Sequence, residues 1–174
     1  MHRDPAPAGT ESVWDHPRPP RVEAATRRVR IAARTPDGGL LPVADVPADP
    51  AHPRAWRVLE TSHPPTYYVA ADTVDARLLA PAGGGSWCEW KGRAAYRDLR
   101  TPDGAPLVAA AAWTYPEPTD GYAVLAGALA FYPGRLVCHL DDERVRAQPG
   151  DFYGGWITDE LRGPFKGDPG TLHW

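Results

Sequence analysis

The chain has 174 residues, a formal net charge of −3 at pH 7 and a pI near 6.0. This length suits one domain with a real core and lies below the length at which cores usually divide. The scattered arginines and mildly acidic balance argue against binding to nucleic acid. No apolar stretch approaches a membrane span, so we expect a cytoplasmic protein without a membrane partner.

Proline and glycine are unusually frequent, with 21 and 17 residues spread along the chain. Helix-breaking residues at this frequency favour short strands and frequent turns. We therefore expect a compact all-β domain, or a β domain with one short helix. The two cysteines, Cys88 and Cys138, have no CxxC partner and are expected to stay reduced.

The first part of the chain is expected to be irregular. Residues 1–12 are small, polar and proline-rich and predict a disordered leader. An extended segment follows at 16–20, anchored by Trp14. The first strand is expected at 27–34, where apolar and arginine side chains alternate, and it ends in a turn at 36–39.

The next apolar run, at 55–60, predicts a second strand and leads into 61–69. Pro64 and Pro65 cannot donate to a sheet, so they mark a strand end or an edge. Residues 72–79 alternate as a strand does, but Leu79 would also join the apolar face of a short helix. Both interpretations stay open.

A flexible glycine-rich loop is expected at 82–85, followed by a strand from about 91 to 99. The sequence Thr-Pro-Asp-Gly at 101–104 has the chemistry of a hairpin turn and leads to a returning strand at 107–115. That strand is mostly alanine, so bulky side chains should pack over it.

The C-terminal third predicts one helical turn at 122–126 and a hairpin around 133–134, with strands at 129–132 and 135–140. A turn is expected at 141–143, and the core should end with 151–158. The expected organisation is a leader at 1–12, one β domain at 13–158 and a loosely held tail at 159–174.

Reactive side chains are most concentrated at 86–96. A thiolate beside a cation is a plausible nucleophile, and Glu60 would complete an arrangement with Cys88 and Lys91. On a continuous strand these two side chains would point to opposite faces, unless Gly92 marks a bulge. The alternative is that Cys88 is a small buried hydrophobe and that Lys91 is either solvated or faces a ligand.

Metal and cofactor sites are not expected. The residues His16, His52, His63 and His139 lie in separate segments, without an HxxxH or HxH pair. The run at 83–86 matches neither GxGxxG nor GxxxxGK[ST].

Many aromatic side chains carry a polar tip, and a buried N–H or O–H needs a partner. Most should form the core opposite the alanine-rich strand, and some should line a cavity. They are Trp14, Tyr67, Tyr68, Trp87, Trp90, Tyr96, Trp113, Tyr115, Tyr132, Tyr153 and Trp156.

Several fragments, in this order, resemble a known family. They are Val-Trp-Asp at 13–15, Arg-Pro-Pro at 18–20, the run at 59–68, Trp-Cys-Glu-Trp-Lys-Gly at 87–92, Ala-Trp-Thr-Tyr-Pro-Glu-Pro at 112–118, Phe-Tyr-Pro at 131–133 and Phe-Tyr-Gly-Gly-Trp at 152–156. Over residues 12–158 the chain resembles the domain of unknown function 427 family, which also carries a nucleotidyltransferase-like label. The resemblance implies an all-β domain near the β-tent or Mss4-like folds, with a small-molecule cavity and no established reaction.

This chain departs from the family pattern in three ways. Glu89 stands where the family usually has proline and adds a charge beside Cys88. The paired cysteines that hold zinc in tent folds are missing, so the resemblance implies the fold without the zinc. No spaced carboxylate pair suits a metal-bound triphosphate.

The resemblance and the side-chain chemistry together define one candidate ligand site. Lys91 would supply a positive charge, Glu60 an acceptor or counter-ion, and the rings a platform for a planar or sugar-like ligand. The predicted set is Glu60, Tyr68, Cys88, Lys91, Tyr96, Trp113, Tyr115 and Trp156.

Three functions fit the sequence. The first is a domain that binds a small molecule of unknown identity in an aromatic cavity. The second is an enzyme that uses Cys88, activated by Lys91 and Glu60. The third is a protein-interaction module, in which the segment at 17–20 or an exposed strand edge binds a partner. The oligomeric state stays open.

Overall fold

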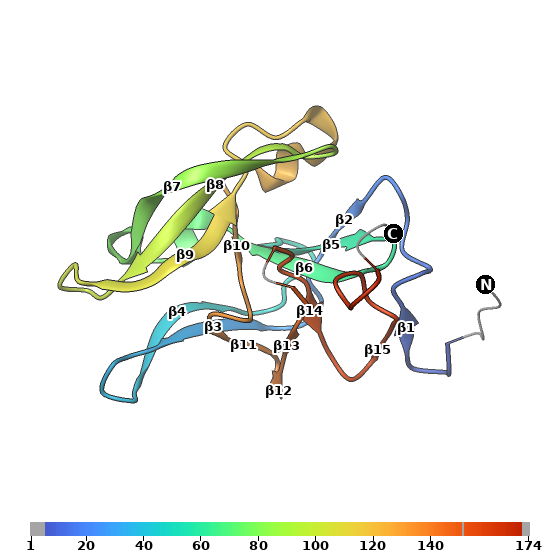
Figure 1. Cartoon of the computed structure of the whole chain (residues 1–174), viewed down its shortest axis with the longest axis horizontal. Helices are drawn as coiled ribbons and strands as arrows, with labels where there is room; N and C mark the ends of the chain where they lie inside the picture. The colour runs from blue at the N-terminus through green and yellow to red at the C-terminus, as the bar shows by residue number, and fades with distance from the viewer. Residues whose placement is uncertain (1–5, 151, 172–174) are drawn as a thin grey trace.

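The computed structural model describes residues 6–150 and 152–171. Strands hold 47% of the chain and helices 7%, in one domain with several antiparallel sheets, which confirms the expected all-β class. Figure 1 shows the larger sheet, with β7, β8 and β9 at its upper edge, lying above the smaller sheet that contains β3 and β4.

The larger sheet has seven strands, and every neighbouring pair in it is antiparallel. β10 lies at its centre and joins the β5–β6 hairpin to the β7–β9 meander. In spatial order the strands are β2 (Arg21–Ala24), β5 (Ala55–Glu60), β6 (His63–Val69), β10 (Leu129–Phe131), β9 (Pro106–Thr114), β8 (Gly92–Arg100) and β7 (Leu79–Cys88).

The smaller sheet has four strands, in the order β12 (Glu143–Arg144), β11 (Val137–Leu140), β3 (Val29–Arg34) and β4 (Leu40–Val46). Two short pairs complete the fold: β1 (Glu11–Ser12) with β15 (Leu161–Arg162), and β13 (Arg146–Ala147) with β14 (Trp156–Ile157). Strand pairing thus extends beyond 13–158 on both sides. Residues 1–5 of the expected leader and 172–174 of the expected tail lie outside the described residues.

Alternation along the strands of the larger sheet builds two separate apolar clusters. On β6, Tyr67 and Val69 join the core that connects the two sheets, while Tyr68 belongs to a cluster on the opposite face. Phe131 and Tyr132 divide in the same way. Successive side chains of a strand point to opposite faces, so the sheet presents one face to the core and the other to the cluster that surrounds the candidate site.

Most predicted strands are present, and three local predictions need correction or completion. The glycine-rich run is not a loop but part of β7, where the register shifts between Pro81 and Gly85. The expected hairpin around 133–134 is wrong, because β10 and β11 lie in different sheets. The open segment 72–79 contains two 3₁₀ turns, η1 (Ala71–Thr73) and η2 (Ala76–Leu78), before β7.

The helical turn expected at 122–126 overlaps η3 (Asp120–Leu125).

An ion-pair network ties the N-terminal segment to β5. The Glu11 carboxylate accepts hydrogen bonds from His16 Nε2 at 2.8 Å and from Arg57 Nη1 at 3.0 Å. The hydrogen bond from His16, with Arg57 acting in the same direction against burial, lowers the pKa of Glu11 to about 2. This network should make the stability of the protein depend on pH.

The folded-state pKa of Glu11 lies below its ordinary value of 4.5, so its contribution is complete above pH 4.5 and is lost as the pH falls towards 2. Glu11→Gln should therefore cost about 2 kcal/mol of unfolding free energy at pH 7 and flatten the stability curve in acid. Urea unfolding between pH 2.5 and 7 measures this, with the more exposed Glu160→Gln as the control. Equal acid sensitivity in Glu11→Gln and the wild type would contradict the assignment.

Candidate functional site

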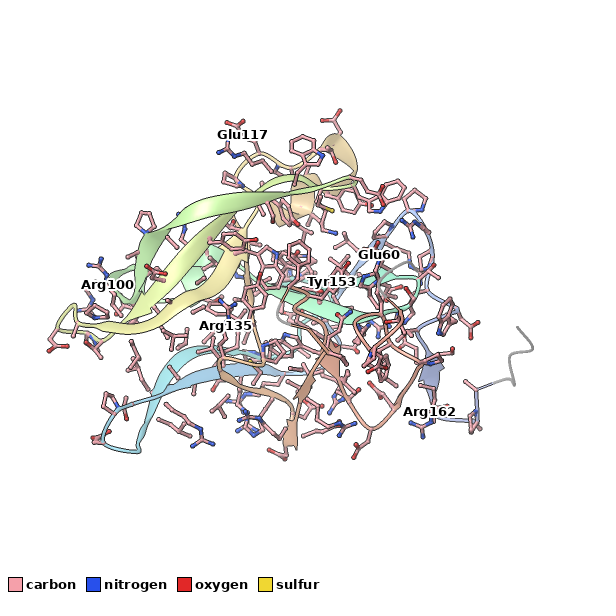
Figure 2. The ribbon with its side chains drawn as sticks, in the orientation of Figure 1. Glu60, Arg100, Glu117, Arg135, Tyr153 and Arg162 are labelled. Carbon is pink, nitrogen blue, oxygen red and sulfur yellow. The ribbon has the colours of Figure 1, made fainter. Side chains whose placement is uncertain are left out.

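A cavity of about 260 Å³ opens on the face of the larger sheet that carries the second apolar cluster. Its lining comes from β5 to β9 of the larger sheet, from the loop between β7 and β8, from Arg18 in the N-terminal segment and from residues near the C-terminus. Figure 2 shows two of its lining residues, Glu60 and Tyr153, in the middle of the molecule, far from Arg100 near the end of the β8–β9 hairpin.

Seven of the eight predicted site residues line this one cavity. They are Glu60, Tyr68, Cys88, Lys91, Tyr96, Trp113 and Tyr115. They come from β5, β6, β8, β9, the residue that follows β9 and the β7–β8 hairpin, so the folding of the larger sheet brings them together.

Trp156 is the exception, because it lies in the core that connects the two sheets. Its side chain is 0% exposed, its indole packs 5.1 Å from the Tyr67 ring between centroids, and its Nε1 donates to the Phe131 carbonyl at 3.2 Å. A large aromatic residue with a polar tip suits a core as well as a cavity. The resemblance and the side-chain chemistry, which together predicted Trp156 as a site residue, do not show which face of the sheet it packs against.

The β7–β8 hairpin explains how Cys88 and Lys91 come to line the same cavity. Cys88 pairs with Gly92, which leaves residues 89–91 as a three-residue loop. Gly92 has φ +90°, a left-handed conformation that such loops require and that glycine adopts without strain. Strand alternation does not operate across a loop, so the two side chains are not forced to opposite faces.

Lys91 is a buried cation. The residue is only 7% exposed. Its Nζ lies 5.9 Å from the Tyr115 ring centroid and 5.7 Å from that of Tyr122. Within residues 6–150 and 152–171, no hydrogen bond or ion pair reaches this ammonium. Two ring faces offset only part of the cost of removing a charge from water. The ammonium is therefore available to an anionic or polar group in the cavity.

Glu60 and His63 form the polar side of the cavity and pair across the β5–β6 turn. Burial lowers the pKa of His63, against an opposing effect of the Glu60 carboxylate, so the imidazole is neutral at pH 7. Its Nδ1 lies 3.0 Å from the Thr61 carbonyl and therefore carries the proton. The other ring nitrogen, Nε2, is left as a hydrogen-bond acceptor.

Tyrosine hydroxyls contribute neutral polar groups to the aromatic wall. Burial raises the pKa of Tyr68 and of Tyr115, and it raises the pKa of Tyr132 to about 12. Trp113 Nε1 donates to Tyr68 Oη at 3.2 Å, which fixes both rings. These side chains can donate to or accept from a ligand without adding charge.

The C-terminal segment adds site residues that sequence reasoning missed. Lys166, in the expected loose tail, lines the cavity with its Nζ 5.6 Å from the Tyr153 ring centroid. Buried Gln148 holds this region: its Nε2 donates to the Lys166 carbonyl at 2.8 Å, and its Oε1 accepts from Gly155 N at 3.2 Å. The one available signal was that Lys166 is, with Lys91, one of only two lysines.

The mouth of the cavity carries an ion pair and two exposed rings. Arg18 Nη2 donates to Glu89 Oε1 at 2.8 Å, which joins the N-terminal segment to the β7–β8 loop. Trp87 is 74% exposed and Phe152 is 62% exposed. Exposed aromatic side chains beside a cavity are typical of surfaces that contact a ligand or a partner.

Neither a metal centre nor a membrane helix is found in the parts of the chain that the structure describes. In residues 6–150 and 152–171, no three His, Cys, Asp or Glu side chains gather closely enough to hold an ion. In the same ranges no helix has the length and apolar character to cross a bilayer.

The fold and the cavity together define an all-β domain whose aromatic cavity holds a buried lysine. The chain belongs to the family described as a domain of unknown function (DUF427), whose profile matches residues 21–145. This confirms the resemblance seen in the sequence. Lys91 and the other six cavity residues predicted from sequence lie within the match, whereas Gln148 and Lys166 lie beyond it. A search of curated proteins found no match.

Proposed function

We propose that this protein binds a small organic molecule in the cavity around Lys91. The observation that carries the proposal is a buried lysine, only 7% exposed as a residue, whose ammonium has no anionic partner among the described residues, in a cavity walled by aromatic rings. Keeping such a charge costs stability, and cavities that combine apolar walls with a few polar groups are the usual form of ligand sites.

Two further expectations belong with this proposal. The arrangement of one large and one small antiparallel sheet supports a β-tent or Mss4-like fold without the zinc. The two free cysteines, Cys88 and Cys138, suit the reducing conditions of the cytoplasm.

Saturation-transfer NMR with a panel of single-ring compounds, anionic, neutral and cationic, tests binding directly. At least one class should give saturable signals with the wild type. Ser86→Phe, which fills the cavity from β7, should abolish them, and Ala82→Phe on the same strand, outside the lining, should not. Absence of binding by every class would overturn the proposal.

A second candidate function is an enzyme that uses Cys88, and one observation favours it: Cys88 is partly exposed and lines the cavity. Cys138 offers a contrast, because it is fully buried and burial raises its thiol pKa to about 12. We expect iodoacetamide to alkylate Cys88 in the folded protein and Cys138 only after unfolding.

The pH dependence of that alkylation separates a reactive thiol from an ordinary one. The enzyme hypothesis requires rapid modification of Cys88 below pH 7, since an activated thiolate forms below the ordinary thiol pKa of about 8.5. Mass spectrometry of the labelled chain, with Cys88→Ser as the control, reads the result. Reaction only near or above pH 8.5 would argue for the binding function alone.

The interaction-module hypothesis receives less support. The N-terminal segment packs on its own domain: Val13 is fully buried, Trp14 Nε1 donates to the Pro164 carbonyl at 2.9 Å, and Tyr122 Oη donates to the Pro20 carbonyl at 2.9 Å. These contacts favour a role for the segment in covering its own domain over a role in binding a partner.

A further inference from the structure

The charges around the cavity are unevenly matched. At the mouth, Arg18 and Glu89 already neutralise each other. Deeper in, Glu60, Lys91 and Lys166 line the cavity, and the Lys91 ammonium lies near the faces of Tyr115 and Tyr122 without a salt bridge to any carboxylate among the described residues. Burial makes an unmatched charge costly, so an anionic group placed at Lys91 would gain more than the same contact at the surface.

The donors in the lining suit a carboxylate better than a phosphate. Besides Lys91 the lining contains Lys166, and the lining residue Trp90 has its indole Nε1 buried with no hydrogen-bond partner among the described residues. Phosphate sites usually gather several backbone N–H groups or arginines around a dianion. Glu60 lines this cavity and would repel a second negative charge on the ligand.

The walls and the volume of the cavity limit the shape and the size of the part of the ligand beyond its anionic group. Rings from Tyr68, Trp113 and Tyr132 form a continuous cluster, in which Trp113 and Tyr132 lie 4.5 Å apart between centroids. The rings are tilted by 45° and 80° to one another, so a planar partner can meet them by stacking on a ring face or by an edge contact. The volume of about 260 Å³ lies just below the range of about 300–1,000 Å³ for drug-sized ligands, which points to a compound of about one ring.

From these observations we infer that the ligand is a monoanionic aromatic carboxylate of about one ring, with its carboxylate bound to Lys91 Nζ and its ring against the aromatic wall. The inference rests on the proposed function, because it names the class of ligand for the same cavity.

Isothermal titration with benzoate, with its neutral analogue benzamide and with inorganic phosphate tests the inference on the wild-type protein. Benzoate should bind at least tenfold more tightly than benzamide, and phosphate should not displace it. If benzamide binds as well as benzoate, the cavity binds small molecules but the inference is wrong. If phosphate competes, the site takes inorganic anions and the carboxylate class is wrong. If neither ring compound binds, the proposed function loses its support as well.

Variants test whether Lys91 supplies the charge that causes the preference for benzoate over benzamide. Lys91→Met should remove the preference for benzoate while benzamide still binds. Arg100→Met removes the same charge near the far end of the β8–β9 hairpin and should leave the preference intact (Figure 2). Circular dichroism checks that both variants fold, and Lys91→Gln provides a second test of the same position. A benzoate preference that survives in folded Lys91→Met or Lys91→Gln would overturn the inference.

Discussion

Trp156→Ala is expected to destabilise the protein by about 3–5 kcal/mol, the cost of removing a large, fully buried aromatic side chain. Trp156 is 0% exposed, packs against Tyr67 and donates to the Phe131 carbonyl, so its removal leaves a cavity and an unpaired carbonyl between the sheets. Urea unfolding at pH 7 measures the loss.

The matched control for this change is Trp87→Ala, since Trp87 is 74% exposed at the mouth of the cavity. Its unfolding free energy should stay within about 0.5 kcal/mol of the wild-type value. If both variants lost similar stability, or if Trp156→Ala lost less than about 1 kcal/mol, the assignment of Trp156 to the core would be wrong.

Gly154→Ala is expected to damage both the fold and the cavity. A Cβ at this position would lie 2.2 Å from Trp113 Cη2 and 2.7 Å from Trp113 Cζ3, so the indole must move. Trp113 lines the cavity and donates to Tyr68. We expect a loss of about 1–3 kcal/mol of unfolding free energy, typical of overpacking, and at least tenfold weaker binding of benzoate.

Gly83→Ala is the control, because no atom lies within 4 Å of a Cβ built there. It should change neither stability nor binding. Thermal unfolding followed by circular dichroism and the benzoate titration supply the two readouts. Wild-type binding in Gly154→Ala would contradict the placement of Trp113 in the ligand site.

Local patterns in the sequence predicted the class of fold and most strands. Alternation identified β3, and the turn chemistry at 101–104 identified the β8–β9 hairpin. The same reasoning gathered seven residues that the fold brings around one cavity, because the resemblance and the residue chemistry pointed to the same segments. The ligand-binding role of those residues remains a prediction.

What escaped sequence reasoning depends on long-range packing. Nothing near Pro133 shows whether β11 returns to β10 or crosses to another sheet, since a hairpin and a crossover begin with the same kind of turn. Lys166 reaches the cavity because Gln148 and the Ser62 carbonyl hold its backbone. The role of Trp156 likewise depends on which face of β6 it packs against. Such contacts join segments that are distant in the sequence, and the local sequence of one segment does not identify the other.

The central claim is that Lys91 is kept buried at a cost to stability because it binds an anionic ligand. Lys91→Met should therefore be the more stable protein without ligand, by about 1 kcal/mol, since a well-packed apolar side chain avoids the desolvation of the charge. For a chain of this size that difference corresponds to roughly 2–4 °C in Tm.

The most direct test is the Tm of the wild type and of Lys91→Met, each with and without saturating benzoate. Without benzoate the variant should melt higher. With benzoate the wild-type Tm should rise, because a ligand that binds the folded state stabilises it, whereas the Tm of the variant should rise clearly less, because it binds benzoate no better than benzamide. A wild type that melts higher without ligand, together with equal responses of both proteins to benzoate, would contradict the account.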